Sequence, residues 1–279
     1  MDKAHPISFA TKIRGVISSA ASWAKIVLAT VSVAVGLKLF VVEAFRIPSA
    51  SMERTLAVGD FILVNKLAYA LQTPRSTPFT DIALPHLSWN ILGTIHRGDV
   101  VVFVLDGQRR DVPQAHLVKR VVGTPGDRVE LRAGSFLVNG RSEKLPKEGI
   151  PPHDGLQLHE QQWEVPRAGQ TAHLSMENFF RWRPLIEQEG HTVSLADEGT
   201  ILIDGNPESR YTVKENYYFV LGDHREASND SRVWGFVPEK DIVGEALFIY
   251  WSLDIEADQD GFVGKISSVR WDRIGNLIR

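Results

Sequence analysis

Cysteine is absent from this chain of 279 residues. The absence excludes disulfide bonds, thiol catalysis and zinc sites built on cysteine, and it fits an oxidising compartment without establishing one. Long basic runs are also missing, and the formal net charge of −3 gives no reason to expect a nucleic acid as partner. Long helical periodicities are few after Arg46, whereas proline, glycine and β-branched residues are plentiful. The bulk of the chain is therefore predicted to be mostly β.

Charged residues are scarce in residues 23–42, an apolar stretch near the N-terminus. Its length matches the ~20 residues that a bilayer-spanning helix requires. Lys25 and Lys38 stand near its two ends, where long side chains can reach the lipid headgroups. Trp23 and Phe40 suit the two membrane interfaces. We therefore predict one transmembrane helix, and the open alternatives are a cleaved signal peptide, a buried core helix and an amphipathic surface helix.

Positive charge before the apolar stretch predicts its orientation. Lys3, Lys12 and Arg14 precede it, and basic residues stay on the cytoplasmic side of a membrane. The predicted organisation is a cytoplasmic tail at residues 1–22, a transmembrane helix at 23–42 and an extracytoplasmic domain at 43–279. We expect a single-pass membrane protein with this domain outside the cytoplasm.

Regular strands and irregular segments alternate along the rest of the chain. Residues 61–64, 100–104, 129–138, 217–221 and 246–251 read as strands. Asn139-Gly140 is a favoured hairpin turn. Residues 73–89 are rich in proline, threonine and serine and predict a loop with little structure. Residues 141–199 are polar and irregular, and we interpret them as an inserted subdomain.

Ser51 and Lys119 are the candidate reactive pair. Serine is a poor nucleophile at neutral pH and needs a neighbouring base. A lysine can serve only when uncharged, so burial must lower its pKa from ~10.4 to roughly 7–8. In a strand at residues 116–122, alternation places Lys119 on one face with Leu117 and Val121, while Arg120 faces the other way and is expected to reach water. Most lysines in strands are solvated, so the pattern alone leaves a structural role open.

Residues 222–235 form a segment of small, hydroxyl and charged side chains after a predicted strand. Such a composition predicts a tightly hydrogen-bonded loop. Asp230 and Arg232 can form a bidentate pair with each other, or with Arg225 or Asp223. The spacing lacks the ligand positions of a calcium-binding EF-hand loop. A purely structural turn is the alternative.

Four segments in this order closely resemble bacterial type I signal peptidase, a family of membrane-bound serine–lysine proteases. They are Ser49-Ala50-Ser51-Met52 with Thr55-Leu56, Arg97-Gly98-Asp99-Val100-Val101-Val102-Phe103, residues 119–127, and Gly222-Asp223-His224-Arg225 continued through Gly235. The resemblance covers about residues 45–250 apart from the middle insertion. It implies a body of coiled antiparallel β-sheet behind one transmembrane helix, with an exposed apolar surface on the bilayer. It implies a serine endopeptidase that removes signal peptides from exported preproteins, with the export machinery as a further candidate partner and no metal or other cofactor.

The resemblance also implies roles for individual residues. Ser51 would attack the scissile carbonyl, and Lys119 would be the general base that later protonates the leaving amine. The Ser51 N–H and the Ser49 hydroxyl would form the oxyanion hole. Ser228 would orient Lys119, as an aspartate orients histidine in a serine–histidine triad.

Supporting residues follow from the same resemblance. Asp230 and Arg232 would brace the loop that carries Ser228. Shallow pockets for small side chains such as alanine would be lined by Phe45, Ile47, Pro48, Met52, Leu56, Leu117 and Val118. The chain departs from the family pattern at Ala50 (usually glycine), Arg54 (usually proline) and His224 (usually asparagine).

Other functional classes share parts of this pattern. Self-cleaving repressor-type serine–lysine proteases have a similar fold and chemistry, but they carry a DNA-binding region, for which the N-terminus shows no helix-turn-helix pattern. Penicillin-recognising Ser-x-x-Lys enzymes need a lysine where Arg54 stands. An anchored, non-catalytic β-domain that binds exported proteins stays open as an alternative.

Overall fold

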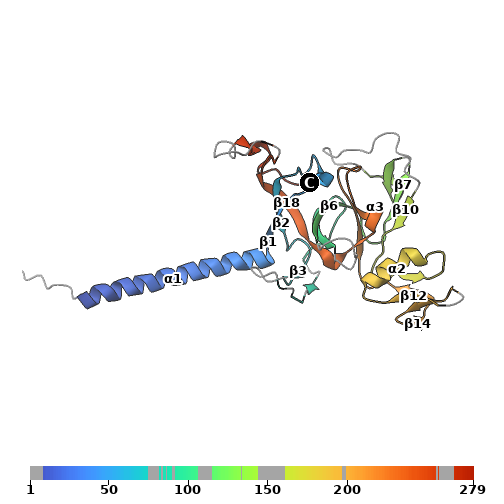
Figure 1. Ribbon diagram of the computed structural model, residues 1–279, viewed down its shortest axis with the longest axis horizontal. Helices are drawn as coiled ribbons and strands as arrows, with labels where there is room; N and C mark the ends of the chain where they lie inside the picture. Colours follow the sequence, from blue (N-terminus) through green and yellow to red (C-terminus); the bar gives the residue numbers. More distant parts are fainter. Residues whose placement is uncertain are drawn as a thin grey trace, which may run out of the picture.

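A long helix projects from a β-rich body in the computed structural model of the chain (Figure 1). The structure describes residues 9–74, 82, 84–85, 87–89, 92–105, 115–132, 134–143, 161–196, 199–255, 257 and 267–279. The helix, α1, spans Phe9–Phe40. Its part Ser22–Phe40 is long and apolar enough to cross a bilayer, with a mean hydropathy of 1.7, and none of it is buried against the body. The membrane-spanning stretch expected at residues 23–42 is therefore helical almost throughout, while the predicted tail at 1–22 is described only from Phe9 onward.

The main sheet has seven antiparallel strands in the order β1-β2-β18-β5-β6-β16-β17. The strands are β1 (Val42–Arg46), β2 (Asp60–Asn65), β5 (Val100–Leu105), β6 (Ala115–Gly123), β16 (Tyr217–Leu221), β17 (Val237–Pro238) and β18 (Ile242–Ser252). Register shifts interrupt the pairing of β18 with both of its neighbours. Such bulges increase the local twist, so the sheet coils instead of lying flat. The predicted mostly β class is confirmed.

A second group of small sheets covers one end of the main sheet. Its strands are β7 (Arg128–Arg132), β8 (Ser135–Val138), β9 (Arg141–Ser142), β10 (Gln161–Glu164), β11 (Thr171–His173), β12 (Val193–Leu195), β13 (Ile201–Ile203), β14 (Asn206–Pro207) and β15 (Arg210–Thr212). They form the sheets β10-β7-β8-β9, β11-β15 and β12-β13-β14, and helix α2 (Phe179–Gln188) accompanies them.

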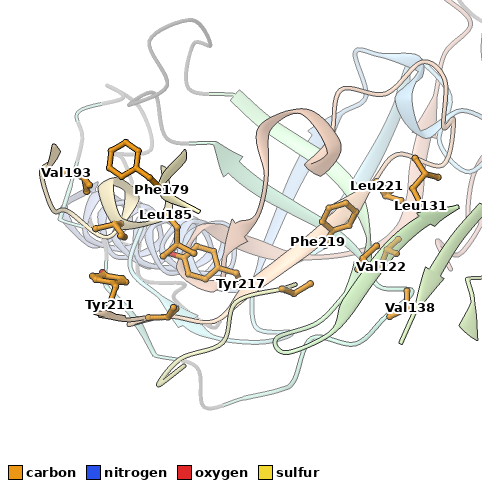
Figure 2. Close-up of a cluster of buried hydrophobic side chains, with 14 of the residues drawn as sticks. Val122, Leu131, Val138, Phe179, Leu185, Val193, Tyr211, Tyr217, Phe219 and Leu221 are labelled. Carbon is orange, nitrogen blue, oxygen red and sulfur yellow. The ribbon is translucent and has the colours of Figure 1, made fainter. Parts of the chain in front are cut away.

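A shared hydrophobic cluster joins this second group to the main sheet (Figure 2). Phe179 and Leu185 of α2 belong to the same buried cluster as Phe219 of β16 and Val122 of β6. The cluster also contains Leu131 of β7, which lies before the segment predicted as an insertion. The packed unit is therefore wider than residues 141–199.

Two hairpins in this region turn in the same way. Asn139 and Gly140 have φ angles of 52° and 75°, and Asp204 and Gly205 have φ angles of 51° and 81°. Two successive positive φ angles match the twist of the flanking strands, which is why Asn-Gly and Asp-Gly are favoured there. The predicted Asn-Gly turn is confirmed, joining β8 to β9.

The connection between the helix and the sheet is short and firmly held. Only Val41 separates α1 from β1, and its carbonyl accepts a hydrogen bond from the Lys66 N–H at 2.8 Å. The Lys66 ammonium donates to the carbonyl of Leu39 at 2.9 Å and pairs with Glu43 at 3.1 Å. Lys66, which directly follows β2, therefore fixes the end of the helix to the first two strands of the sheet.

A small hairpin follows this connection. Strands β3 (Leu71–Gln72) and β4 (Ser88–Trp89) pair antiparallel. The segment between them was expected to be a loop with little structure, and most of it lies outside the described residues. The remaining short helices are η1 (Ala50–Met52), α3 (Ser231–Trp234), η3 (Glu239–Asp241) and η4 (Trp271–Arg273).

Candidate active site

Coiling of the main sheet brings β1, the first strand in the sheet order, next to β6, the fifth. Phe45 of β1 lies with its ring centroid 4.9 Å from that of His116 in β6, although three strands separate β1 from β6 in the sheet order. Ser51 follows β1 in the short helix η1, and Lys119 lies in the middle of β6. The curvature therefore closes a distance of 68 residues in sequence and places the two candidate reactive groups together.

Lys119 Nζ lies 2.8 Å from Ser51 Oγ. Both residues are buried, with 3% and 8% of their surfaces exposed. The Lys119 amine also donates to the carbonyl of Val118 at 3.0 Å, which fixes its direction. This is the separation at which an uncharged amine can take the proton of a serine hydroxyl.

Burial lowers the pKa of Lys119 from its ordinary value of 10.5 to about 8. Loss of solvent is the largest cause, because a charged ammonium is costly in an apolar interior. The negative charges of Asp230 and Asp223 act in the opposite direction and keep the pKa from falling further. The Lys119 amine is therefore shielded from solvent, as predicted. With this pKa, a substantial fraction of the amine is neutral in mildly alkaline solution.

Ser49 is exposed and lies beside Ser51, the candidate nucleophile. Its hydroxyl oxygen is 3.4 Å from Ser51 Oγ, so it borders the space where a scissile carbonyl would sit. A hydroxyl and a backbone N–H at such a position can share the charge of an oxyanion. The geometry fits the expected role of Ser49, which stays a prediction.

Ser228 is close to the pair but is not bonded to it. Its Oγ is buried and has no hydrogen-bond partner, so the expected bond to Lys119 is not formed in this structure. A methyl group at Gly222 would collide with both the Ser228 hydroxyl and the Ser51 carbonyl oxygen, so glycine allows the two segments to approach. Ser228 therefore lies against the nucleophile segment, with a free hydroxyl.

Asp230 and Arg232 form the bidentate pair that the sequence suggested. Arg232 Nε donates to Asp230 Oδ1 at 2.7 Å, and Nη2 donates to Oδ2 at 2.8 Å. Arg232 Nη2 also donates to the carbonyls of Arg225 and Ser228 at 2.6 and 3.3 Å. The pair therefore ties together both ends of the loop that carries Ser228.

Arg120 is buried, against the expectation that it reaches water. Its guanidinium forms two hydrogen bonds with Asp223, Nε to Oδ1 at 2.8 Å and Nη2 to Oδ2 at 2.7 Å. Thr55 Oγ1 donates to the same carboxylate at 2.6 Å. The alternation of side chains along β6 correctly places Arg120 and Lys119 on opposite faces of the strand. The face that carries Arg120 is nevertheless also covered by protein.

The expected pocket residues divide into two groups. Met52 and Leu56 are 1% and 0% exposed and belong to the core, together with Ile47. These three side chains pack in the core beside the site, and their contact with a substrate stays a prediction. The other four residues, Phe45, Pro48, Leu117 and Val118, keep exposed surface. Phe45 and Val118 pack on the same core cluster as Met52, whereas Leu117 packs on another.

The three departures from the family pattern have different consequences. Ala50 has no positive φ, so the loss of the usual glycine causes no strain there. Arg54 has a φ of +74°, a left-handed conformation that proline cannot adopt. The backbone N–H of His224 donates to the Ser51 carbonyl at 3.1 Å, a bond that does not depend on the side chain, and the ring Nδ1 lies 3.1 Å from Glu53 Oε2 without hydrogen-bond alignment.

Sequence patterns did not reveal the charged groups that support the nucleophile segment from a distance. Asp60 is fully buried and accepts from Arg273 at 2.6 Å and from Ser252 at 2.7 Å. Arg225 pairs with Glu143 across 82 residues. No local signal in the sequence connects such partners. Within the described part of the chain, no three histidine, aspartate or glutamate side chains are placed to hold a metal ion.

Comparisons with known proteins all point to one family. The family described as "Signal peptidase, peptidase S26" matches residues 20–251. Signal peptidase I of Pseudomonas aeruginosa is 35% identical over 231 residues, covering 77% of this chain and 67% of the relative. Signal peptidase I of Aquifex aeolicus is 33% identical, covering 77% of this chain and 78% of the relative. Signal peptidase I of Haemophilus influenzae is 31% identical over 271 residues, covering 87% of this chain and 73% of the relative.

Proposed function

The chain belongs to the S26 signal peptidase family, whose members remove signal peptides as serine endopeptidases, and we propose that Ser51 and Lys119 carry out this cleavage here. The observation that carries the proposal is the 2.8 Å separation of Lys119 Nζ from Ser51 Oγ in a buried setting. The lowered pKa of Lys119, about 8, supports it because the base must be neutral to accept a proton.

The reaction begins with proton transfer from the Ser51 hydroxyl to neutral Lys119. Ser51 Oγ attacks the carbonyl carbon of the scissile bond, and a tetrahedral oxyanion forms. The Ser51 N–H and the Ser49 hydroxyl are the proposed donors to this oxyanion, supported by the 3.4 Å distance between the two hydroxyl oxygens. The Lys119 ammonium then protonates the leaving amine, and the mature protein departs with a free N-terminus.

The second half of the reaction uses the same base. Lys119 is neutral again and removes a proton from water, which attacks the ester carbonyl on Ser51. Collapse of the second tetrahedral species returns the proton to Ser51 and releases the signal peptide with a free carboxylate. Val118 holds the amine in place throughout, because its carbonyl accepts one of the N–H groups.

Recognition of the substrate is proposed to use the surface beside Ser51. Strand β1 is the edge of the main sheet, and an extended peptide can bond to a free sheet edge. Phe45, Pro48, Leu117 and Val118 keep exposed surface and are proposed to contact small side chains before the cut. Signal peptides are the proposed partners, together with the export machinery that delivers them.

The protein is anchored by its N-terminal helix, and we propose that the N-terminus is cytoplasmic. The apolar part of α1 supports insertion, and Lys3, Lys12 and Arg14 before it support the orientation. In this arrangement the catalytic domain lies on the outer, periplasmic side of the inner membrane, where exported precursors emerge.

Replacement of Ser51 or Lys119 by alanine tests the catalytic assignment. Purified S51A and K119A are expected to leave a signal-peptide-bearing precursor uncut in detergent or liposomes, while the wild type releases the mature chain. Leu84→Ala, at an exposed leucine in the β3–β4 connection, serves as the matched control and should cleave normally. Unchanged cleavage by S51A would favour a non-catalytic binding role, and cleavage of the chain by itself would favour the repressor-type alternative.

A further inference from the structure

The loop that carries Ser228 touches the nucleophile segment directly. The His224 N–H donates to the Ser51 carbonyl, and the neighbouring Asp223 N–H points at the sulfur of Met52 at 3.4 Å. Gly222 lies too close to Ser51 for any side chain to fit between them. A small shift of this loop therefore moves Ser51 relative to Lys119.

Arg232 and Asp230 set the shape of the loop from within. Asp230 Oδ2 accepts the Gly222 N–H at 3.1 Å, and Arg232 holds Asp230 while donating to the carbonyl of Arg225. All of these groups belong to the loop itself. Such a closed set fixes the internal shape of the loop but does not fix its position relative to the rest of the protein.

Arg225 attaches the loop to the second group of sheets, in addition to the pair that Asp223 of the same loop forms with Arg120 of β6. Its side chain is 2% exposed, and its Nη1 and Nη2 each lie 3.0 Å from one oxygen of Glu143. Its guanidinium carbon is 5.1 Å from the ring centroid of Phe136. Phe136 and Glu143 both come from the β8–β9 hairpin region of the second group of sheets. A bidentate carboxylate and an aromatic face together fix both the direction and the plane of a guanidinium.

We propose that Glu143 is a positioning residue for catalysis: through Arg225 it anchors the Ser228 loop, and thereby the nucleophile segment, to the second group of sheets. Glu143 does not touch the reacting atoms. Its effect passes from Arg225 to Arg232 and Asp230, and from the loop to the Ser51 carbonyl. The inference rests on the proposed roles of Ser51 and Lys119, and it assigns a catalytic consequence to a region outside the four family motifs.

The decisive variant is Glu143→Gln, which keeps the shape of the side chain and removes its charge. We expect the kcat for precursor cleavage to fall roughly 10- to 100-fold, because misplacement of about 1 Å costs that much, while KM changes little. Glu143→Asp, which keeps the charge, should recover part of the loss. In an R225Q background, Glu143→Gln should have little further effect, since the link is already broken.

The pH dependence separates positioning from simple loss of folded protein. Loosening of the loop admits water to Lys119. Loss of solvent has the largest effect on the pKa of that amine, ahead of the charges of Asp230 and Asp223. The acidic limb of the rate profile should therefore move to higher pH in E143Q. Rates are expressed per folded molecule from melting curves, and E187Q, which breaks the exposed Arg183–Glu187 pair, is the matched control.

Two results would overturn the inference. One is an E143Q enzyme with wild-type kcat and an unshifted pH profile. The other is a loss of activity that is fully explained by the unfolded fraction. Parallel assays of S51A distinguish this failure from failure of the catalytic assignment, because the assignment fails only if S51A still cleaves the precursor.

Discussion

Arg120 and Asp223 form a fully buried bidentate ion pair immediately behind the candidate base, with 6% and 0% of their side chains exposed. Arg120 also donates to the carbonyls of Gly98 and Arg279 at 2.6 and 3.0 Å. One guanidinium therefore joins β6, the loop after β16 and the C-terminal segment.

Removal of the Asp223 charge should be strongly destabilising. Asp223→Asn leaves the buried Arg120 cation without its partner, and breaking such a pair costs about 3–5 kcal/mol. Denaturant unfolding of the purified protein measures this loss. Glu187→Gln removes an exposed partner in α2 and should cost about 0.5 kcal/mol or less. Equal losses from the two variants would contradict the buried character of the first pair.

The rate of cleavage should depend on pH through Lys119. The general base must be neutral, and its pKa is about 8, so kcat/KM should fall about tenfold per pH unit well below that value and level off above it. A kcat/KM profile between mildly acidic and strongly alkaline solution tests this. A midpoint near the ordinary lysine value of 10.5, or a flat profile, would show that Lys119 is not the titrating base.

The same buried amine should reduce stability. The lowering of its pKa from 10.5 to about 8 corresponds to about 3 kcal/mol at 1.36 kcal/mol per pKa unit. Because the folded pKa is below the unfolded one, the penalty is complete below pH 8, decreases between pH 8 and 10.5, and disappears above. Lys119→Met should therefore be inactive but more stable at neutral pH by up to about 3 kcal/mol. Its advantage in denaturant unfolding should vanish at strongly alkaline pH.

Because the backbone at Arg54 is left-handed, we expect two substitutions there to change the stability of the protein in different directions. Arg54→Gly should leave stability unchanged or raise it by about 1 kcal/mol, because glycine adopts a φ of +74° without strain. Arg54→Pro should lower stability by about 3 kcal/mol, because proline is locked near −65°. Thermal unfolding of both variants measures the difference. A stable R54P protein would mean that this turn readily adopts another conformation.

Local patterns were sufficient wherever a property depends on neighbours in sequence. Strand alternation predicted the burial of Lys119, and the Asn139-Gly140 pair predicted a hairpin with two positive φ angles. Asp230 and Arg232 are two residues apart, and their pairing was among the possibilities that the sequence offered. These features follow from the geometry of a strand, a turn and a short loop.

Partners far apart in sequence could not be predicted in the same way. Arg120 was expected in solvent because a strand pattern does not show what covers its second face, and Asp223 lies 103 residues away. The bidentate pair of Arg225 with Glu143 could not be predicted for the same reason, because the two residues lie 82 positions apart in the sequence. Met52 and Leu56 are buried, and the sequence could not show this, because apolar residues near a nucleophile suit a pocket and a core equally well.

The grip of Lys66 on the end of α1 has a geometric consequence for the choice of cleavage site. With only Val41 between helix and sheet, the catalytic domain has no flexible stalk on which to rise or tilt. We therefore expect the Ser51 hydroxyl to stand at a fixed height above the lipid and a precursor to be cut at that height. Lengthening the link after Phe40 should then move the preferred bond toward the mature side.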